Sequence, residues 1–273
     1  MAVSGRPLVG GCSSSEDALG TASIALHVTY NSSCFQPKGD VLDHSDLGNN
    51  LDRLLGLKHA AIAIAFLGEA PAGMSRVKKA GPAGCSYWKL ATDGETFYTT
   101  GEDHQNCPVG AYTHGVKLGA EKSKELQGMI GQMISLNYLQ EAEIPQIPHR
   151  EQSLAYVAYS PLKKAPFEPQ IVLIRGDAKH LMLLTEAMAR AGVASEPMMM
   201  RPTCAVLPQV LKSGHASHSL GCIGNRVYTG LGDDEFYCAI PAAKMGQVVA
   251  ELENIVSANN ALKEFHQARF ANA

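Results

Sequence analysis

The sequence predicts an α+β (mixed α/β) fold in which sheets pack against helices. Three observations predict it: apolar runs of strand length, apolar residues at helical spacing, and an irregular alternation of the two. The clearest unit spans residues 169–192, where the apolar run "QIVLIRG" precedes Asp177 as a helix N-cap and Gly192 as the helix stop. The irregular order favours this layered arrangement over a barrel.

The same criteria predict the other elements. Further strands are predicted over residues 59–68, 96–101, 153–162 and 235–241, with at most a short strand at 22–30, and helices over 45–57, 122–145 and from residue 245 onward. The helix at 122–145 has one apolar face, formed by Leu126, Met129, Ile130, Met133 and Ile134. That face would either pack on the core or join two copies of the chain as a homo-oligomer.

The chain divides by pattern into a poorly patterned, Gly- and Ser-rich segment, residues 1–42, and a single globular domain, residues 43–273. Within the domain, each half contains an apolar strand, two cysteines, and a strand that ends in proline. If this echo is a true internal repeat, the halves pack about a pseudo-two-fold axis with four cysteines between them. The alternative is chance similarity among strands.

Composition excludes several functions. The formal net charge is −3 and no Lys- or Arg-rich stripe appears, which argues against nucleic acid as a partner. No apolar run approaches the roughly 18 residues that a membrane span requires. We expect a cytoplasmic protein, in which the seven cysteines are ligands, redox groups or apolar fillers. A chain of 273 residues needs no metal to fold, so a metal site would be functional.

Four cysteines lie in loops punctuated by glycine and proline: Cys85 in "GPAGCSYW", Cys107 in "NCPVGAY", Cys204 in "RPTCAVLP" and Cys222 in "SLGCIGNR". Such loops let the backbone approach a compact inorganic centre closely. A cysteine followed by proline, as at Cys107, also occurs at iron–sulfur ligands. Four thiolates can hold an iron–sulfur cluster or a tetrahedral zinc ion. Alternatively, all four are buried thiols. Cys238, inside a predicted strand, is interpreted as apolar filler.

Histidines and one arginine supply further candidates. His104 and His114 flank Cys107, whereas His215 and His218 precede Cys222. They are reserve metal ligands, for zinc or copper, or partners that activate a cysteine nucleophile. Arg226 lies between glycines and is predicted to bind a small anion. Dinucleotide, P-loop, GxSxG and HExxH motifs are absent from the sequence.

The cysteine loops together identify a resemblance. "PAGCSYWKLA", "FYTTGEDHQNCPVGAYTHG", "RPTCAVLP" and "SLGCIGNRVYTGLGDDEFYCAIP" occur in the same order as in the uncharacterised family called domain of unknown function 169, and the likeness covers about residues 45–260. The resemblance implies no known reaction. Members of that family are common in anaerobes, which suits an oxygen-sensitive metal centre. It implies Cys85, Cys107 and Cys204 as shared cysteines, with Cys222 less uniform.

These observations lead to one hypothesis and its rivals. The hypothesis is a [4Fe–4S] cluster bound by Cys85, Cys107, Cys204 and Cys222, which serves electron transfer with a redox partner or binds a small anionic ligand near Arg226. The rivals are a thiol enzyme that uses Cys107 with His104 or His114, a haem, zinc or copper carrier, and a metal-free binding module for a small metabolite. The sequence does not decide whether the protein is an enzyme.

Overall fold

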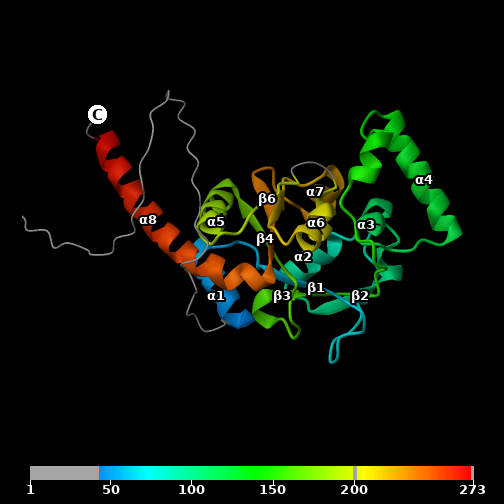
Figure 1. Cartoon of the computed structure of the whole chain (residues 1–273), viewed down its shortest axis with the longest axis horizontal. Helices are drawn as coiled ribbons and strands as arrows, with labels where there is room; N and C mark the ends of the chain where they lie inside the picture. Colours follow the sequence, from blue (N-terminus) through cyan, green and yellow to red (C-terminus); the bar gives the residue numbers. More distant parts are fainter. Residues whose placement is uncertain (1–42, 199–201, 272–273) are drawn as a thin grey trace, which may run out of the picture. The chain divides into compact units, whose positions relative to one another are not determined.

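A six-stranded antiparallel sheet organises the chain in the computed structural model, which describes residues 43–198 and 202–271 (Figure 1). Its strands are β1 (Ile62–Leu67), β2 (Phe97–Thr100), β3 (Tyr156–Pro161), β4 (Ile171–Asp177), β5 (Ser217–Ser219) and β6 (Glu235–Pro241). Their order across the sheet is β2-β3-β1-β4-β6-β5, and every neighbouring pair is antiparallel. The predicted α+β class is confirmed. The predicted segment 1–42, including the strand at 22–30, lies outside the described residues.

The sheet is covered on both faces, which explains why its strands are continuous apolar runs. Successive side chains of a strand point to opposite faces. In β4, Val172 and Ile174 pack into one apolar cluster, whereas Ile171 and Leu173 pack into the other. The two clusters are therefore separated by the backbone of the sheet.

Three long helices cover the first face: α1 (His44–Leu55), α5 (Ala178–Arg190) and α8 (Met245–Ala271). The side chains of Leu51, Leu184 and Leu252, one from each helix, are fully buried there. As predicted, Asp177 caps α5 by accepting the His180 N–H at 3.0 Å. The predicted helices at 45–57 and from residue 245 are confirmed, and their apolar faces form this core.

Short helices cover the second face: α2 (Ser86–Thr92), α3 (Pro108–Thr113), α6 (Val206–Ser213) and α7 (Ile223–Thr229), together with the 3₁₀ turns η1 (Gly101–His104) and η4 (Thr203–Ala205). In Figure 1 they gather on the opposite side of the sheet from α1 and α8. Trp88 of α2 is fully buried and meets the ring of Tyr237 edge-on, with centroids 5.1 Å apart. Sequence reasoning missed these helices because six to eight residues show too little periodicity.

The helix predicted at 122–145 is shorter than expected. α4 spans Ala120–Ser135, and a 3₁₀ turn, η2 (Glu141–Gln146), follows it. Asn137, with φ at +53°, turns the chain just after α4. None of the side chains of α4 is buried, and Ile134 and the following Leu136 are exposed. The predicted apolar face therefore covers no core, and a homo-oligomer formed through it stays a prediction.

The second half of α8 extends away from the sheet (Figure 1). Its Leu262, Phe265 and Phe270 side chains are exposed. No helix in the described ranges combines the length and apolar character that a membrane span requires.

The strand order is symmetric about the β1–β4 pair. On one side β3 and then β2 follow β1, and on the other β6 and then β5 follow β4. β3 and β6 both end in proline and continue into a 3₁₀ turn, η3 (Leu162–Lys164) and η5 (Ala242–Lys244). The helices differ, because α1 precedes β1 whereas α5 follows β4. The internal repeat stays a prediction.

Candidate functional site

A cavity of about 230 Å³ lies beside the second face, and all four predicted cysteines line it. Cys85, Cys107 and Cys222 are the N-cap residues of α2, α3 and α7, and Cys204 lies in η4, just before α6. Each cysteine thus stands where a loop enters a short helix. The fold brings together four side chains that are up to 137 residues apart, as the numbers 85 and 222 give.

The four sulfur atoms lie within electrostatic range of one another. Burial, together with negative charge on Cys107 and Cys222, raises the pKa of the Cys85 thiol to about 12. Burial also raises the pKa of Cys204 well above its ordinary value, and charge on each of the other three adds to this effect. Burial and charge on Cys222 likewise raise the pKa of Cys107. Without a cation the buried sulfurs stay thiols, because several thiolates together would repel one another.

Cys107 is surrounded by backbone donors. The Gly110 N–H donates to its Sγ at 3.4 Å, and the backbone N–H groups of Gly84 and Val109 also favour its thiolate form. A Cβ on Gly110 would stand 3.3 Å from Sγ and 3.7 Å from the Gly84 nitrogen. Glycine at position 110 is therefore what allows the amide to approach the sulfur. Pro108 begins α3, where no backbone N–H is required.

Two threonines hold the other loops in place. The buried Thr113 hydroxyl lies 2.9 Å from the Gly110 carbonyl and 3.2 Å from Sγ of Cys204, and its single proton is shared between these two acceptors. The Thr203 hydroxyl oxygen accepts the backbone N–H of Cys222 at 2.5 Å. Through these contacts α3 is joined to η4, and η4 is joined to the start of α7. Neither threonine could be predicted from the sequence, because a single hydroxyl carries no pattern.

Asn225 is a site residue that sequence reasoning missed. It lies three residues after Cys222 in α7, lines the cavity and is 1% exposed. Its side-chain amide lies near Cys85 and favours the thiolate form of that residue, which lowers the pKa of the thiol. Neither polar atom of the amide has a hydrogen-bond partner among the described residues. An unpaired buried amide is costly, so a group that pairs with it would stabilise the site.

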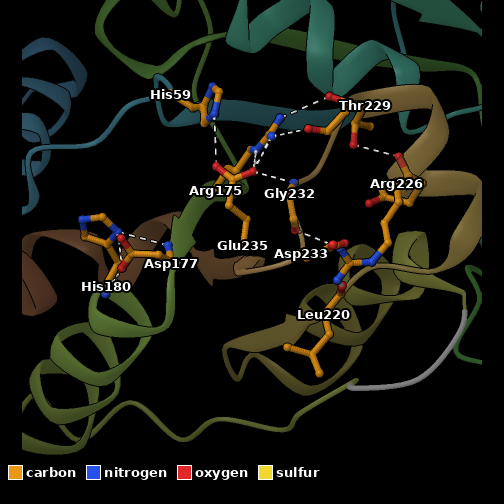
Figure 2. Close-up of polar contacts among 12 residues, drawn as sticks. His59, Arg175, Asp177, His180, Leu220, Arg226, Thr229, Gly232, Asp233 and Glu235 are labelled. Atoms are coloured by element: carbon orange, nitrogen blue, oxygen red, sulfur yellow. Dashed lines mark hydrogen bonds and ion pairs between the residues drawn. The ribbon is translucent and has the colours of Figure 1, made fainter.

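Arg175 of β4 supports α7 from behind the cavity (Figure 2). Its guanidinium donates to the carbonyls of Thr229, at 3.2 Å, and Gly230, at 2.5 Å, at the C-terminal end of α7. It also forms an ion pair with Glu235, which accepts the Gly232 N–H at 2.7 Å. The cation satisfies carbonyls that the helix end leaves unpaired. Arg175 thereby fixes the segment that carries Cys222 and Asn225.

The predicted anion-binding role of Arg226 finds no support. Its guanidinium donates to the carbonyls of Leu220, at 2.6 Å, and Gly232, at 2.8 Å, and contacts Asp233 at 3.4 Å (Figure 2). It is not among the residues that line the cavity. The glycines around it, which suggested an exposed anion grip, instead bring loop carbonyls within its reach. Arg226 joins the residues before α7 to those after it.

The reserve histidines do not line the cavity either. His104 and His114 are buried behind Gly84, where a Cβ would stand 3.2 Å from an atom of each ring. Burial lowers the pKa of His104 to about 3 and that of His114 well below its ordinary value, so both are neutral at pH 7. His215 contacts Glu196 at 2.5 Å, and His218 contacts the Ser195 hydroxyl at 3.1 Å. These two histidines lie near β5 and make local contacts.

No group of three or more His, Cys, Asp or Glu side chains within residues 43–198 and 202–271 is arranged to hold a metal ion as the side chains stand. Five cysteines of these ranges are free thiols, and Cys238 is fully buried on the opposite face of the sheet. The interpretation of Cys238 as apolar filler agrees with this position. The site therefore consists of Cys85, Cys107, Cys204 and Cys222 with the donors around them.

Comparison with known proteins identifies the family. The sequence profile of domain of unknown function 169, described as uncharacterised ArCR, matches residues 50–251. The chain belongs to this family. No curated protein and no solved structure matches the chain. The matched residues of this DUF169 member include all four cysteines, Asn225, Arg175 and the whole sheet.

Proposed function

We propose that Cys85, Cys107, Cys204 and Cys222 bind an iron–sulfur cluster, most simply a [4Fe–4S] cluster, for electron transfer. The observation that carries the proposal is that four thiols line one cavity, with backbone N–H groups around Cys107, the Thr113 hydroxyl beside Cys204 and the Asn225 amide near Cys85. Family membership itself assigns no chemistry, so the proposal depends on this geometry.

The donors favour sulfur in its anionic form. Backbone N–H groups surround Cys107, the Thr113 hydroxyl lies 3.2 Å from Sγ of Cys204, and the Asn225 amide lies near Cys85. Hydrogen bonds to an ionised acceptor are about twice as strong as those to a neutral one. A thiol is a weak acceptor, so these donors gain most when a metal centre keeps the cysteines deprotonated. Buried thiols that only fill space do not need them.

A cluster and a single metal ion require different arrangements of the four cysteines. The thiolates that hold one zinc ion all touch the same small cation, and no such group is formed by the described side chains. A cluster places its own iron and sulfide atoms between the thiolates, so its ligands stand farther apart. The four cysteines that line this cavity supply the four thiolates that a cluster requires.

A bound cluster would accept and release one electron. The residues of this chain would hold it by four thiolates, screen it from water, and adjust its potential. Donors near the sulfurs stabilise added negative charge, whereas burial among apolar side chains opposes it. The redox partner would approach the cavity side. Free thiols suit a reducing compartment, and this supports the proposed cytoplasmic location.

The thiol-enzyme alternative has less support from the geometry. A nucleophilic cysteine needs a lowered pKa and a cationic neighbour, but burial raises the pKa of Cys107. The hydrogen bond to its sulfur comes from Gly110. Burial keeps both His104 and His114 neutral at pH 7. Neither ring can supply the imidazolium that would stabilise a Cys107 thiolate.

The test is to purify the whole chain without oxygen from cells that overproduce cluster-assembly proteins. The expected product is brown, with about four iron and about four sulfide per chain, and its four site cysteines resist iodoacetamide until the iron is chelated. Zinc, copper or haem would be recognised by elemental analysis and the visible spectrum. A colourless, iron-free product with one cysteine that reacts selectively at neutral pH would sink the proposal in favour of a thiol enzyme.

A further inference from the structure

The cavity that contains the four cysteines has an uncharged lining. Among residues 43–198 and 202–271, no Asp, Glu, Lys, Arg or His side chain lines it. We propose that this cavity also binds a small, uncharged molecule with an apolar body and a hydrogen-bond donor, beside the cysteines. The inference rests on the proposed function, because it names the class of ligand that would lie next to the cluster.

Charge excludes an ionic ligand. Arg226, the cation predicted for this role, donates to loop carbonyls, and Arg150 lies over the ring of Phe66 at 4.4 Å. An anion in the cavity would meet no cationic side chain of the described residues and would face cysteine sulfurs that carry negative charge when they bind metal. A cation would lack a carboxylate partner. Burying an ion without a partner is expensive, whereas a neutral molecule avoids this cost.

Apolar side chains from two helices supply a binding wall. Met129 and Met133 come from α4, Ile223 and Tyr228 come from α7, and all four line the cavity. Methionine adapts its shape readily, which suits a wall that meets a ligand. The cavity volume is about 230 Å³, and an apolar cavity of about 150 Å³ is enough to bind benzene. A cluster between the cysteines would take part of this space, so the ligand would lie against the wall formed by α4 and α7 and have a body no larger than about one aromatic ring.

The wall is accessible to a ligand. α4 packs on α3, and none of its own side chains is buried. On α7, Ile223 is 66% exposed and Tyr228 is 41% exposed although both line the cavity. These two helices thus form the part of the lining that faces solvent. A small molecule can enter between them with little disturbance of the core.

Asn225 gives the cavity a polar contact. Its amide is buried, lines the cavity and has no hydrogen-bond partner among the described residues. The NH₂ group of the amide can donate to a cysteine thiolate. Its oxygen cannot pair with a thiolate, because both are hydrogen-bond acceptors. The Oδ1 atom is therefore left for an N–H or O–H group of a ligand. Two other polar side chains of the lining are occupied, since Asn106 donates to the Gly81 carbonyl and Thr203 accepts from Cys222.

Three probes of one shape and different charge test the proposal: benzamide, benzoate and benzamidine. Calorimetric or NMR titration of the whole chain, purified without oxygen, should show benzamide binding at least about tenfold more tightly than either ion. Equal or tighter binding of benzoate or benzamidine would overturn the proposal. So would the absence of benzamide binding up to the limit of its solubility.

Variants locate the binding. Met133→Glu adds a carboxylate to the wall and should weaken benzamide binding at least about tenfold, whereas Met182→Glu, on an exposed part of α5, should leave it unchanged. Equal loss in both variants, or none in either, would contradict the assigned site. Iron content is measured on the same samples. A chain that is purified without iron but binds benzamide would refute the cluster and retain the uncharged ligand. A brown chain that binds none of the three probes would retain the cluster and refute the uncharged ligand.

Discussion

The two faces of the sheet are built from the same strands but differ in what they bury. The first face packs apolar side chains of α1, α5 and α8, such as the fully buried Leu51 and Leu184. The second face carries the cavity and its four cysteines. It also buries polar atoms without a partner among the described residues, including Trp88 Nε1, His104 Nδ1 and both polar atoms of the Asn225 amide.

The difference shows how one sheet serves two purposes. In β6, the neighbouring residues Tyr237 and Cys238 face opposite layers. Cys238 therefore packs in the apolar core of the first face, away from the four site cysteines. Close packing on the first face supplies stability. That stability allows the second face to retain a cavity and unpaired polar groups, which cost free energy.

The largest difference between the two faces is expected when one cysteine is replaced on each of them. Cys107→Ala removes a proposed ligand and should lower iron to a small fraction of the wild-type content. Cys238→Ala should cost about 1 kcal/mol of stability, because it leaves a small cavity, and should retain the iron. Iron analysis and urea unfolding measure both effects. Equal iron contents in the two variants would contradict the assignment of the faces.

A second pair of variants separates stability from site geometry. Arg175→Met breaks a buried ion pair and leaves Glu235 with His59 and the Gly232 N–H as its remaining partners, at a cost of up to about 3–5 kcal/mol. Leu184→Ala on the first face should cost a similar amount, about 2–5 kcal/mol. Only Arg175→Met should accelerate alkylation of Cys222 in the metal-free chain, since α7 then loses its support. The same alkylation rate in both variants would show that Arg175 contributes stability alone.

The raised thiol pKa values predict how stability depends on pH in the metal-free chain. The pKa of Cys85 is about 12 in the folded chain and about 8.5 in an unfolded one. Above pH 8.5 the unfolded state therefore binds fewer protons, and stability falls as pH rises towards 12, by about 1.4 kcal/mol per pH unit for this thiol. Urea midpoints between pH 8 and 9.5 should fall less steeply for Cys85→Ala than for wild type. If the urea midpoints of Cys85→Ala and wild type fell equally steeply with pH, the raised pKa of buried Cys85 would be contradicted.

The smallest effect is expected at Asn225. Asn225→Leu removes a donor near Cys85 and should lower the reduction potential of the bound cluster, because less negative charge is stabilised. Its stability should change by less than about 1.5 kcal/mol, since an unpaired buried amide is lost. Asn106→Leu is the matched control, because that amide donates to the Gly81 carbonyl. Protein-film voltammetry compares them, and identical potentials would remove Asn225 from the site.

Much of the fold could be predicted from the sequence, because buried strands are apolar runs and long helices repeat with a clear period. β5 could not, since it is the polar triplet Ser217–Ser219 whose pairing depends on β6. The four cysteines were identified by their glycine- and proline-rich loops. Asn225 carries no local signal, and the partners of Arg226 are carbonyls of two loops that only folding brings together. Contacts of that kind are tertiary and leave no pattern in the sequence.

The four cysteines of the second face are proposed to hold one cluster. Native mass spectrometry of the chain purified without oxygen tests it most directly, because intact mass counts what is bound. The account predicts a chain heavier by one cluster of about four iron and about four sulfide, and a bare mass for Cys204→Ala. A wild-type chain at its bare mass, or heavier by a single zinc ion, would contradict the account.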